Sequence, residues 1–139
     1  MTDEEREAFL REANVAVLST VDARGRPHAA PVWYLYDDGV FRISTGDGSQ
    51  KHRNILANPN ISLVIDQRAL PYYAVMVQGT ADIGPAFSDE DSLRLAVRYL
   101  GENLGERYAG RTDAEASISL TIRPRKLIVY DPMPGFRRR

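Results

Sequence analysis

The stretch FRISTGDGSQKHRN, residues 41–54, passes from an alternating run into a glycine-interrupted loop and then into a short helical pattern. Phe41 and Ile43 alternate with polar neighbours, and this period of two predicts a half-buried strand. The glycines free the backbone to turn and to approach a ligand closely. Ser49 suits the N-cap of a helix that we expect from about Gln50 to Ala57.

The same loop gathers groups that bind phosphate. Thr45 and Ser49 offer hydroxyls, Lys51 and Arg53 offer positive charge, and the helix start favours an anion. On a regular helix, however, Lys51 and Arg53 point to nearly opposite sides. We therefore rank Lys51 above Arg53, which then serves a second group or packs elsewhere. An ordinary strand-to-helix turn with solvated charges remains open, because short glycine motifs are weak signals.

Upstream of this loop, the pattern predicts a helix and two extended segments. The helix begins at Thr2 or Asp3 and runs to about residue 13, with Phe9 and Leu10 as core contacts. A strand over 15–21 and a turn over 22–25 lead into extended structure over 27–36. Pro27 and Pro31 limit that last segment to a sheet edge or to irregular pairing.

Downstream, further strands and one long helix are expected. Strands are predicted over 61–66, 72–83, 116–122 and 126–130, with a bulge at Gly79 and an interruption at 123–125. A helix over 88–103 carries Leu93, Ala96, Val97 and Leu100 at helical spacing, and the tail over 131–139 is expected to be irregular. Because no linker or repeat is visible, we expect a single domain over 1–139, an antiparallel barrel with helical additions.

Composition narrows the class of protein. A chain of 139 residues with 43% hydrophobic and 27% charged residues is typical of a soluble globular domain. The formal net charge of −1 argues against nucleic acid as the partner, and no apolar run is long enough for a membrane span. The absence of cysteine and the acidic N-terminus agree with a cytoplasmic location. His28 and His52 have no ligand-like spacing to other residues, so no metal site is expected.

The segment PVWYLY, residues 31–36, offers a second candidate feature. A strand interrupted by proline leaves backbone amides unpaired, and these can face a planar heterocycle walled by Trp33 and Tyr34. The same aromatic residues are equally compatible with a core or a dimer contact. Tyr72 and Tyr73 raise the same question.

Three stretches together resemble a known superfamily. They are VLST at 17–20, DARGRPHAAPVWY at 22–34 and STGDGSQKHRNILANP at 44–59. In order and spacing they resemble the pyridoxamine 5′-phosphate oxidase-like, FMN-binding split-barrel superfamily, and within it the flavin/deazaflavin branch that depends on coenzyme F420. The resemblance implies a mainly β (α+β) fold, a split β-barrel of about six antiparallel strands with peripheral helices.

The resemblance also implies a homodimer with cofactor sites at the subunit interface. The matching positions for the cofactor phosphate are Ser44, Thr45, Ser49, Gln50, Lys51 and Arg53, and those for the tricyclic ring are Pro31, Val32 and Trp33. No residue of the chain is marked as a catalytic acid, so the catalytic residues stay unknown.

The function that follows from the resemblance is hydride transfer from reduced F420 to a small unsaturated substrate. An FMN-binding, flavin reductase-like protein related to pyridoxamine phosphate oxidase is the alternative, and a non-catalytic cofactor-binding module is a third reading. Tyr72, Tyr73 or water could protonate the product, and the sequence does not choose among them.

Overall fold

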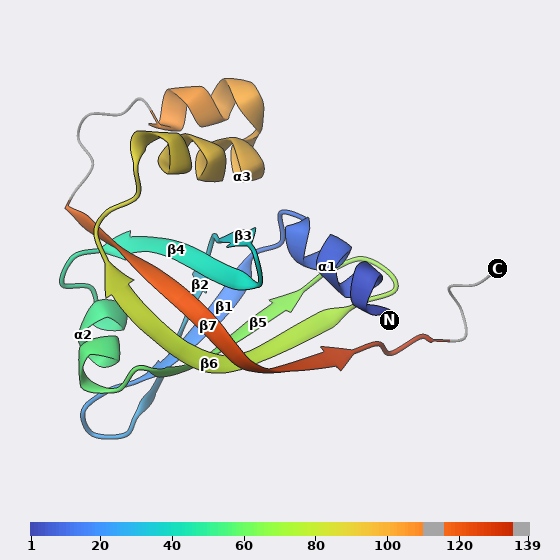
Figure 1. Ribbon diagram of the computed structural model, residues 1–139, viewed down its shortest axis with the longest axis horizontal. Helices are drawn as coiled ribbons and strands as arrows, with labels where there is room; N and C mark the ends of the chain where they lie inside the picture. Colours follow the sequence, from blue (N-terminus) through green and yellow to red (C-terminus); the bar gives the residue numbers. More distant parts are fainter. Residues whose placement is uncertain (110–115, 135–139) are drawn as a thin grey trace.

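The computed structural model describes residues 1–109 and 116–134, in which seven antiparallel strands form one curled sheet accompanied by three helices (Figure 1). The strands are β1 (Ala16–Val21), β2 (Pro27–Val32), β3 (Leu35–Asp37), β4 (Val40–Gly46), β5 (Asn60–Asp66), β6 (Ala74–Gly84) and β7 (Ser117–Tyr130). The helices are α1 (Asp3–Arg11), α2 (Gln50–Ala57) and α3 (Asp89–Ala109). The expected mainly β split-barrel fold is confirmed, with seven strands rather than about six.

Strand alternation builds the core. Across the sheet order β2-β1-β5-β6-β7-β4-β3, every second residue of the central strands points inward. Leu18, Ile43, Leu63, Val77 and Leu120 are fully buried on that inner face. The burial of these large aliphatic side chains is the main force that holds the curled sheet closed.

The two edge strands come from one short segment of chain. β2 and β3 lie at opposite ends of the strand order, so residues 33 and 34 cross the opening of the barrel from one edge to the other. The edge position expected from Pro27 and Pro31 is confirmed. The expected continuous extension to Tyr36 is wrong, because the fully buried Tyr34 leaves the ladder and donates its hydroxyl to the Leu10 carbonyl at 2.9 Å.

Several local predictions are confirmed. The Gly25 N–H donates to the Asp22 carbonyl at 3.0 Å, which closes the turn between β1 and β2. Ser49 caps α2, which spans Gln50–Ala57 as expected. The register of β6 against β7 shifts between Gln78 and Gly79, where an added Cβ would collide with the backbone of Arg123. Phe9 and Leu10 of α1 are buried in the core.

The expected break between two C-terminal strands is wrong. β7 runs without interruption from Ser117 to Tyr130, pairing with β4 in its first half and with β6 along most of its length. The pairs Gln78–Lys126 and Gly79–Pro124 skip Arg125, which is therefore the extra residue of a bulge in β7. Pro124 is tolerated beside this bulge although it has no N–H to donate to the ladder. Residues 131–134 lie outside the helices and strands, as expected, and the rest of the tail lies outside the described residues.

Helix α3 is longer than the 88–103 expected, and it is bent. Gly101 adopts a φ of 83° inside it, and two arms fold back on each other beyond the sheet (Figure 1). The arms approach closely at Gly105, where an added Cβ would lie 2.7 Å from the Val97 backbone. The expected apolar stripe is only partly buried: Ala96 is covered, but Leu93 stays 39% exposed because α3 stands off the sheet.

Within the described residues, no helix combines the length and apolar character needed to span a membrane.

Candidate functional site

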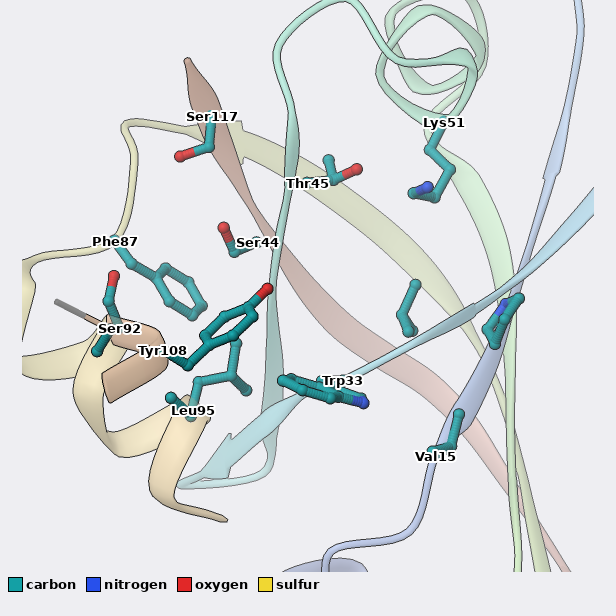
Figure 2. Close-up of a pocket in the computed structure, with 14 residues that line it drawn as sticks. Val15, Trp33, Ser44, Thr45, Lys51, Phe87, Ser92, Leu95, Tyr108 and Ser117 are labelled. Atoms are coloured by element: carbon teal, nitrogen blue, oxygen red, sulfur yellow. The ribbon is translucent and has the colours of Figure 1, made fainter. Parts of the chain in front are cut away.

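A pocket of about 640 Å³ lies between the curled sheet and α3 (Figure 2). Its walls come from strands β2, β4 and β7, from segments next to them, and from helices α2 and α3. The lining residues are Val15, Pro31, Val32, Trp33, Ser44, Thr45, Lys51, Phe87, Ser92, Leu95, Ala96, Tyr108, Ala109 and Ser117. Lys51 is the only charged side chain among these, so the described part of the chain contributes one cationic group to a largely apolar and hydroxyl-bearing surface.

The cationic end of the pocket lies where β4 meets α2. Lys51 is half-buried, and it makes no ion pair or hydrogen bond with a side chain of residues 1–109 or 116–134. The Thr45 hydroxyl lies 3.3 Å from the Ser49 hydroxyl, which in turn accepts the His52 N–H at the start of α2. A helix start and an unpaired ammonium together favour an anion, because both present positive charge to the same space.

The loop before α2 is fixed by its own backbone contacts. Gly48 adopts a φ of 78°, a conformation that glycine reaches without strain. Its N–H donates to His52 Nδ1 at 3.0 Å, and the same ring nitrogen lies 3.4 Å from a carboxylate oxygen of Asp47. The loop is therefore held in place by contacts that do not use Lys51.

The other end of the pocket is aromatic. Trp33 stacks on Tyr99 with ring centroids 4.9 Å apart and planes 5° from parallel, and the Tyr108 ring lies 6.0 Å from Trp33. In Figure 2, Phe87, Leu95 and Tyr108 gather at this end, away from Lys51. A flat, apolar ring system would find stacking partners here.

One amide freed by the interrupted edge strand has a partner on α3. The Tyr34 N–H donates to the Tyr99 hydroxyl at 3.1 Å, and that hydroxyl donates to the Asn14 carbonyl at 2.9 Å. This amide is therefore turned toward α3 and is not free to face a heterocycle, as the interrupted strand alone would allow.

Charged groups hold the first arm of α3, the part that precedes Gly101, over the pocket. Arg42 of β4 donates to Asp91 at 2.7 Å, and Arg94 donates to Asp37 at 3.1 Å. The Arg94 guanidinium holds the pKa of the Asp37 carboxyl below its ordinary value, and Arg42 does the same for Asp91. Both aspartates are thus charged at neutral pH, and the anchoring is electrostatic.

Arg98 adds a second anchor. Its guanidinium donates to the carbonyl oxygens of Arg11 and Glu12 at 2.6 Å each, at the C-terminal end of α1, and lies 4.9 Å from the centre of the Tyr34 ring. A cation at a helix C-terminus is favourable because it meets unpaired carbonyls and the negative end of the dipole.

The structure brings together most of the residues that the sequence singled out. Six line the pocket directly: Pro31, Val32, Trp33, Ser44, Thr45 and Lys51. Ser49 touches the pocket wall through Thr45. Gln50 and Arg53 line a second, smaller depression, because α2 is a regular helix from its first residue and turns them away from Lys51.

Sequence reasoning missed the contribution of α3. No short sequence motif marks the residues at this end of the pocket, which are Phe87, Leu95, Tyr99 and Tyr108. The sequence pattern also does not show that the helix bends at Gly101 and that Tyr108 therefore lies near Trp33. Tyr72 and Tyr73, which the sequence offers as proton donors to the product, do not line the pocket. Tyr73 packs edge-on against Phe9 instead, at a centroid distance of 6.0 Å. No group of three or more His, Asp or Glu side chains in the described part of the chain is placed to hold a metal ion.

Comparison with known proteins identifies the family. The sequence model described as pyridoxamine 5′-phosphate oxidase matches residues 2–132. The chain belongs to this family. This match confirms the superfamily predicted from the motifs at 17–20, 22–34 and 44–59.

Relatives within the oxidase family are longer than this chain. This chain is 36% identical over 104 residues to the pyridoxine/pyridoxamine 5′-phosphate oxidase of Rubrobacter xylanophilus. The aligned residues make up 74% of this chain and 46% of that protein. This chain is 32% identical over 131 residues to the oxidase of Paraburkholderia phytofirmans, covering 92% and 60%. The chain thus spans about half the length of these curated relatives.

A solved structure matches over nearly the whole of both chains. It is described as an F420 reductase, with a TM-score of 0.75, 28% sequence identity, and coverage of 88% of this chain and 94% of that one.

Proposed function

We propose that the protein is an oxidoreductase that binds coenzyme F420 in the main pocket and reduces a small unsaturated substrate there. When bound, the deazaflavin ring supplies the hydride chemistry, and the protein supplies binding and orientation. The observation that carries this proposal is the pairing of one free ammonium, Lys51, with an aromatic wall at the other end of the same pocket.

The residues present fit a phosphate-bearing tricyclic cofactor. Lys51, the Thr45 and Ser49 hydroxyls and the N–H groups at the start of α2 would hold the phosphate. Trp33 would lie against the ring, with Pro31 and Val32 beside it. Because Tyr99 already covers one face of Trp33, its opposite face is the one left for a ligand. Ser44 lies between the two ends (Figure 2).

F420 is preferred over FMN because of the structural match to a protein described as an F420 reductase, which aligns over almost the full length of both chains. FMN is the second candidate. It is favoured by the curated relatives, which are named pyridoxine/pyridoxamine 5′-phosphate oxidases and belong to a superfamily that binds FMN. A phosphate-bearing substrate is not favoured, since Lys51 is the only charged group that lines the pocket in the described chain.

The acceptor would occupy the aromatic end, beside Phe87, Leu95 and Tyr108. No carboxylate or histidine from the described residues lines this end, so we assign no catalytic acid. An uncharged, flat acceptor suits this surface best, because it gains from burial and stacking and gives up little hydration.

A homodimer and a cytoplasmic location are part of the same proposal. The pocket is not fully enclosed by one copy of the chain, since its lining residues Val15 and Tyr108 are each 46% exposed. A second copy of the chain would cover exposed lining residues of this kind, as the family resemblance implies. Light scattering during size-exclusion chromatography measures the assembly, and a monomer at every concentration would contradict this part.

An equilibrium titration of the purified, cofactor-free protein with F420 and with FMN tests the cofactor. Trp33 is the only tryptophan in the sequence, so quenching of its emission reports binding at the pocket. Tighter binding of F420, with turnover of reduced F420 on a panel of quinones and enones, supports the proposal. Tighter binding of FMN would identify the pocket as the site of a flavin enzyme instead. Binding without turnover would identify the protein as a non-catalytic binding module. No binding of either cofactor would reject the proposed cofactor site.

A further inference from the structure

A second depression, of about 280 Å³, lies beside α2 and is lined by residues of the β1–β2 turn and of the first turns of α2. Its lining residues are Asp22, Ala23, Arg24, Arg26, Gln50, Arg53 and Asn54. Three of these seven residues are arginines, whereas Lys51 is the one cation that lines the main pocket among residues 1–109 and 116–134. Nothing in the main pocket requires this concentration of positive charge.

The one carboxylate of the depression is already committed. Asp22 accepts the backbone N–H groups of Arg24 and Arg26, each at 2.9 Å, and the Arg26 Nε–H at 2.7 Å. These contacts, with the Arg26 backbone N–H first, hold the pKa of Asp22 below its ordinary value. One negative charge therefore faces three guanidinium groups. Arg24 makes no side-chain hydrogen bond or ion pair to any residue that the structure describes.

Arg53 is held by a chain of hydrogen bonds that starts in the core. Asn54 and Thr20 are 2% and 1% exposed, and the Asn54 amide donates to the Thr20 hydroxyl at 2.9 Å. The Gln50 amide donates to the Asn54 oxygen at 2.6 Å, which leaves its own oxygen to accept from Arg53, also at 2.6 Å. Each amide is thus oriented by the one before it.

This series of hydrogen bonds distinguishes the depression from an ordinary charged surface. A solvated arginine keeps its rotamer freedom, and fixing it costs side-chain entropy. Here two buried polar side chains and Gln50 fix Arg53 at the rim while its remaining N–H donors are left for a ligand. Guanidinium groups bind phosphate and carboxylate through paired N–H donors, which is the geometry that such fixing favours.

We propose that this arginine depression is a second anion site, which binds a phosphate or carboxylate group separately from the group held at Lys51. The proposal stands without the cofactor assignment. The anion is either a free small molecule or the charged far end of a longer molecule seated in the main pocket, because Gln50 and Lys51 are adjacent in α2.

Tripolyphosphate is the probe for the first source, titrated calorimetrically at low salt. We expect saturable binding that is about tenfold or more weaker in Arg53→Gln, as for the loss of a charged hydrogen bond. Gln50→Leu leaves Arg53 in place but removes its anchor, and it should weaken binding by a smaller factor. Arg68→Gln is the matched control, since Arg68 is 92% exposed and lies outside the depression.

Lys51→Ala separates the two sites: it should leave tripolyphosphate binding intact. Equal affinity in the wild type, Arg53→Gln and Arg68→Gln would overturn the proposal and leave a solvated surface. Loss of binding in Lys51→Ala alone would also overturn it, by placing the anion in the main pocket. Melting temperatures without anion show whether Arg53→Gln is folded, because the variant should match the wild type there.

F420 and FMN, titrated into the same variants, test the second source. Weaker binding of F420 but not of FMN in Arg53→Gln assigns the site to the anionic tail that only F420 carries. Unchanged binding of both assigns it to a separate small anion, provided that tripolyphosphate binds. Equal weakening of both would overturn a separate site, because Arg53 would then act on the phosphate that the two cofactors share.

Discussion

The two walls of the main pocket are held by different forces. The wall formed by β4 and the start of α2 rises from the core, where Ile43 is fully buried next to the pocket-facing Ser44. The wall formed by α3 is held by surface ion pairs, by Arg98 and by the stacking of Tyr99 on Trp33. The first wall is thus part of the folding unit, and the second is docked onto it. Changes to the first should unfold the protein, whereas changes to the second should open the pocket.

The sheet wall should lose the most stability on substitution. Ile43→Ala removes a fully buried side chain and should lower the free energy of unfolding by about 2–5 kcal/mol. Leu93→Ala on α3 is the comparison, because Leu93 is partly exposed and its loss should cost well under that amount. Urea unfolding followed by circular dichroism measures both. Similar losses in the two variants would remove the distinction between the walls.

A smaller effect is expected from tightening the bend of α3. Gly105→Ala places a methyl group against the Val97 backbone, and the strain of such overpacking is about 1–3 kcal/mol. The strain should be relieved by moving the second arm, which carries Tyr108, away from Trp33. Hydrogen exchange should then rise in residues 101–109 and stay unchanged in β5 and β6. A uniform rise across the chain would contradict a separately docked arm.

The smallest effect is expected from pH. The pKa values of Asp37 and Asp91 are lowered below 3.8 in the folded protein by Arg94 and Arg42. Their contribution to stability is therefore present above that value and is lost as the pH falls through the folded pKa values. Because these pairs are partly exposed, each is worth only about 0–1 kcal/mol. Trp33 emission should shift reversibly below about pH 4 in the wild type.

Asp91→Asn is the control for this titration. The variant should show a weaker acid shift and a partly shifted emission already at neutral pH, since one anchor of α3 is absent at every pH. An emission spectrum that is unchanged from pH 7 to pH 3 in the wild type would mean that these ion pairs do not hold the α3 wall.

The contrast between the walls also explains what could be predicted from the sequence. The sheet wall is encoded locally: alternation at 41–44, the glycine loop and the Ser49 cap lie within fourteen residues, so their patterns are visible directly. The same local reasoning placed Lys51 and Arg53 on opposite sides of α2, and the structure puts them in different pockets.

The α3 wall could not be predicted in this way, because its geometry depends on contacts between distant residues. Tyr99 meets Trp33 across 66 positions, and Tyr108 reaches it only because the chain reverses at Gly101. Pro124 misled the strand prediction for a related reason. A bulge at Arg125 lets β7 continue past the proline and keep pairing with β6, and no pattern around residue 124 reveals that pairing.

We propose that Lys51 marks the anion end of a cofactor site, and the affinity for F420 without this lysine decides whether it does. F420 is titrated into the wild type, Lys51→Ala and Lys126→Ala, with Trp33 emission as the signal; Lys126 is the only other lysine in the sequence and lies on the exposed surface of β7. Loss of a charged hydrogen bond is worth about 1.5–3 kcal/mol, so Lys51→Ala should bind about 10-fold to 150-fold more weakly. Lys126→Ala should bind like the wild type. Equal affinity in all three proteins would contradict the account.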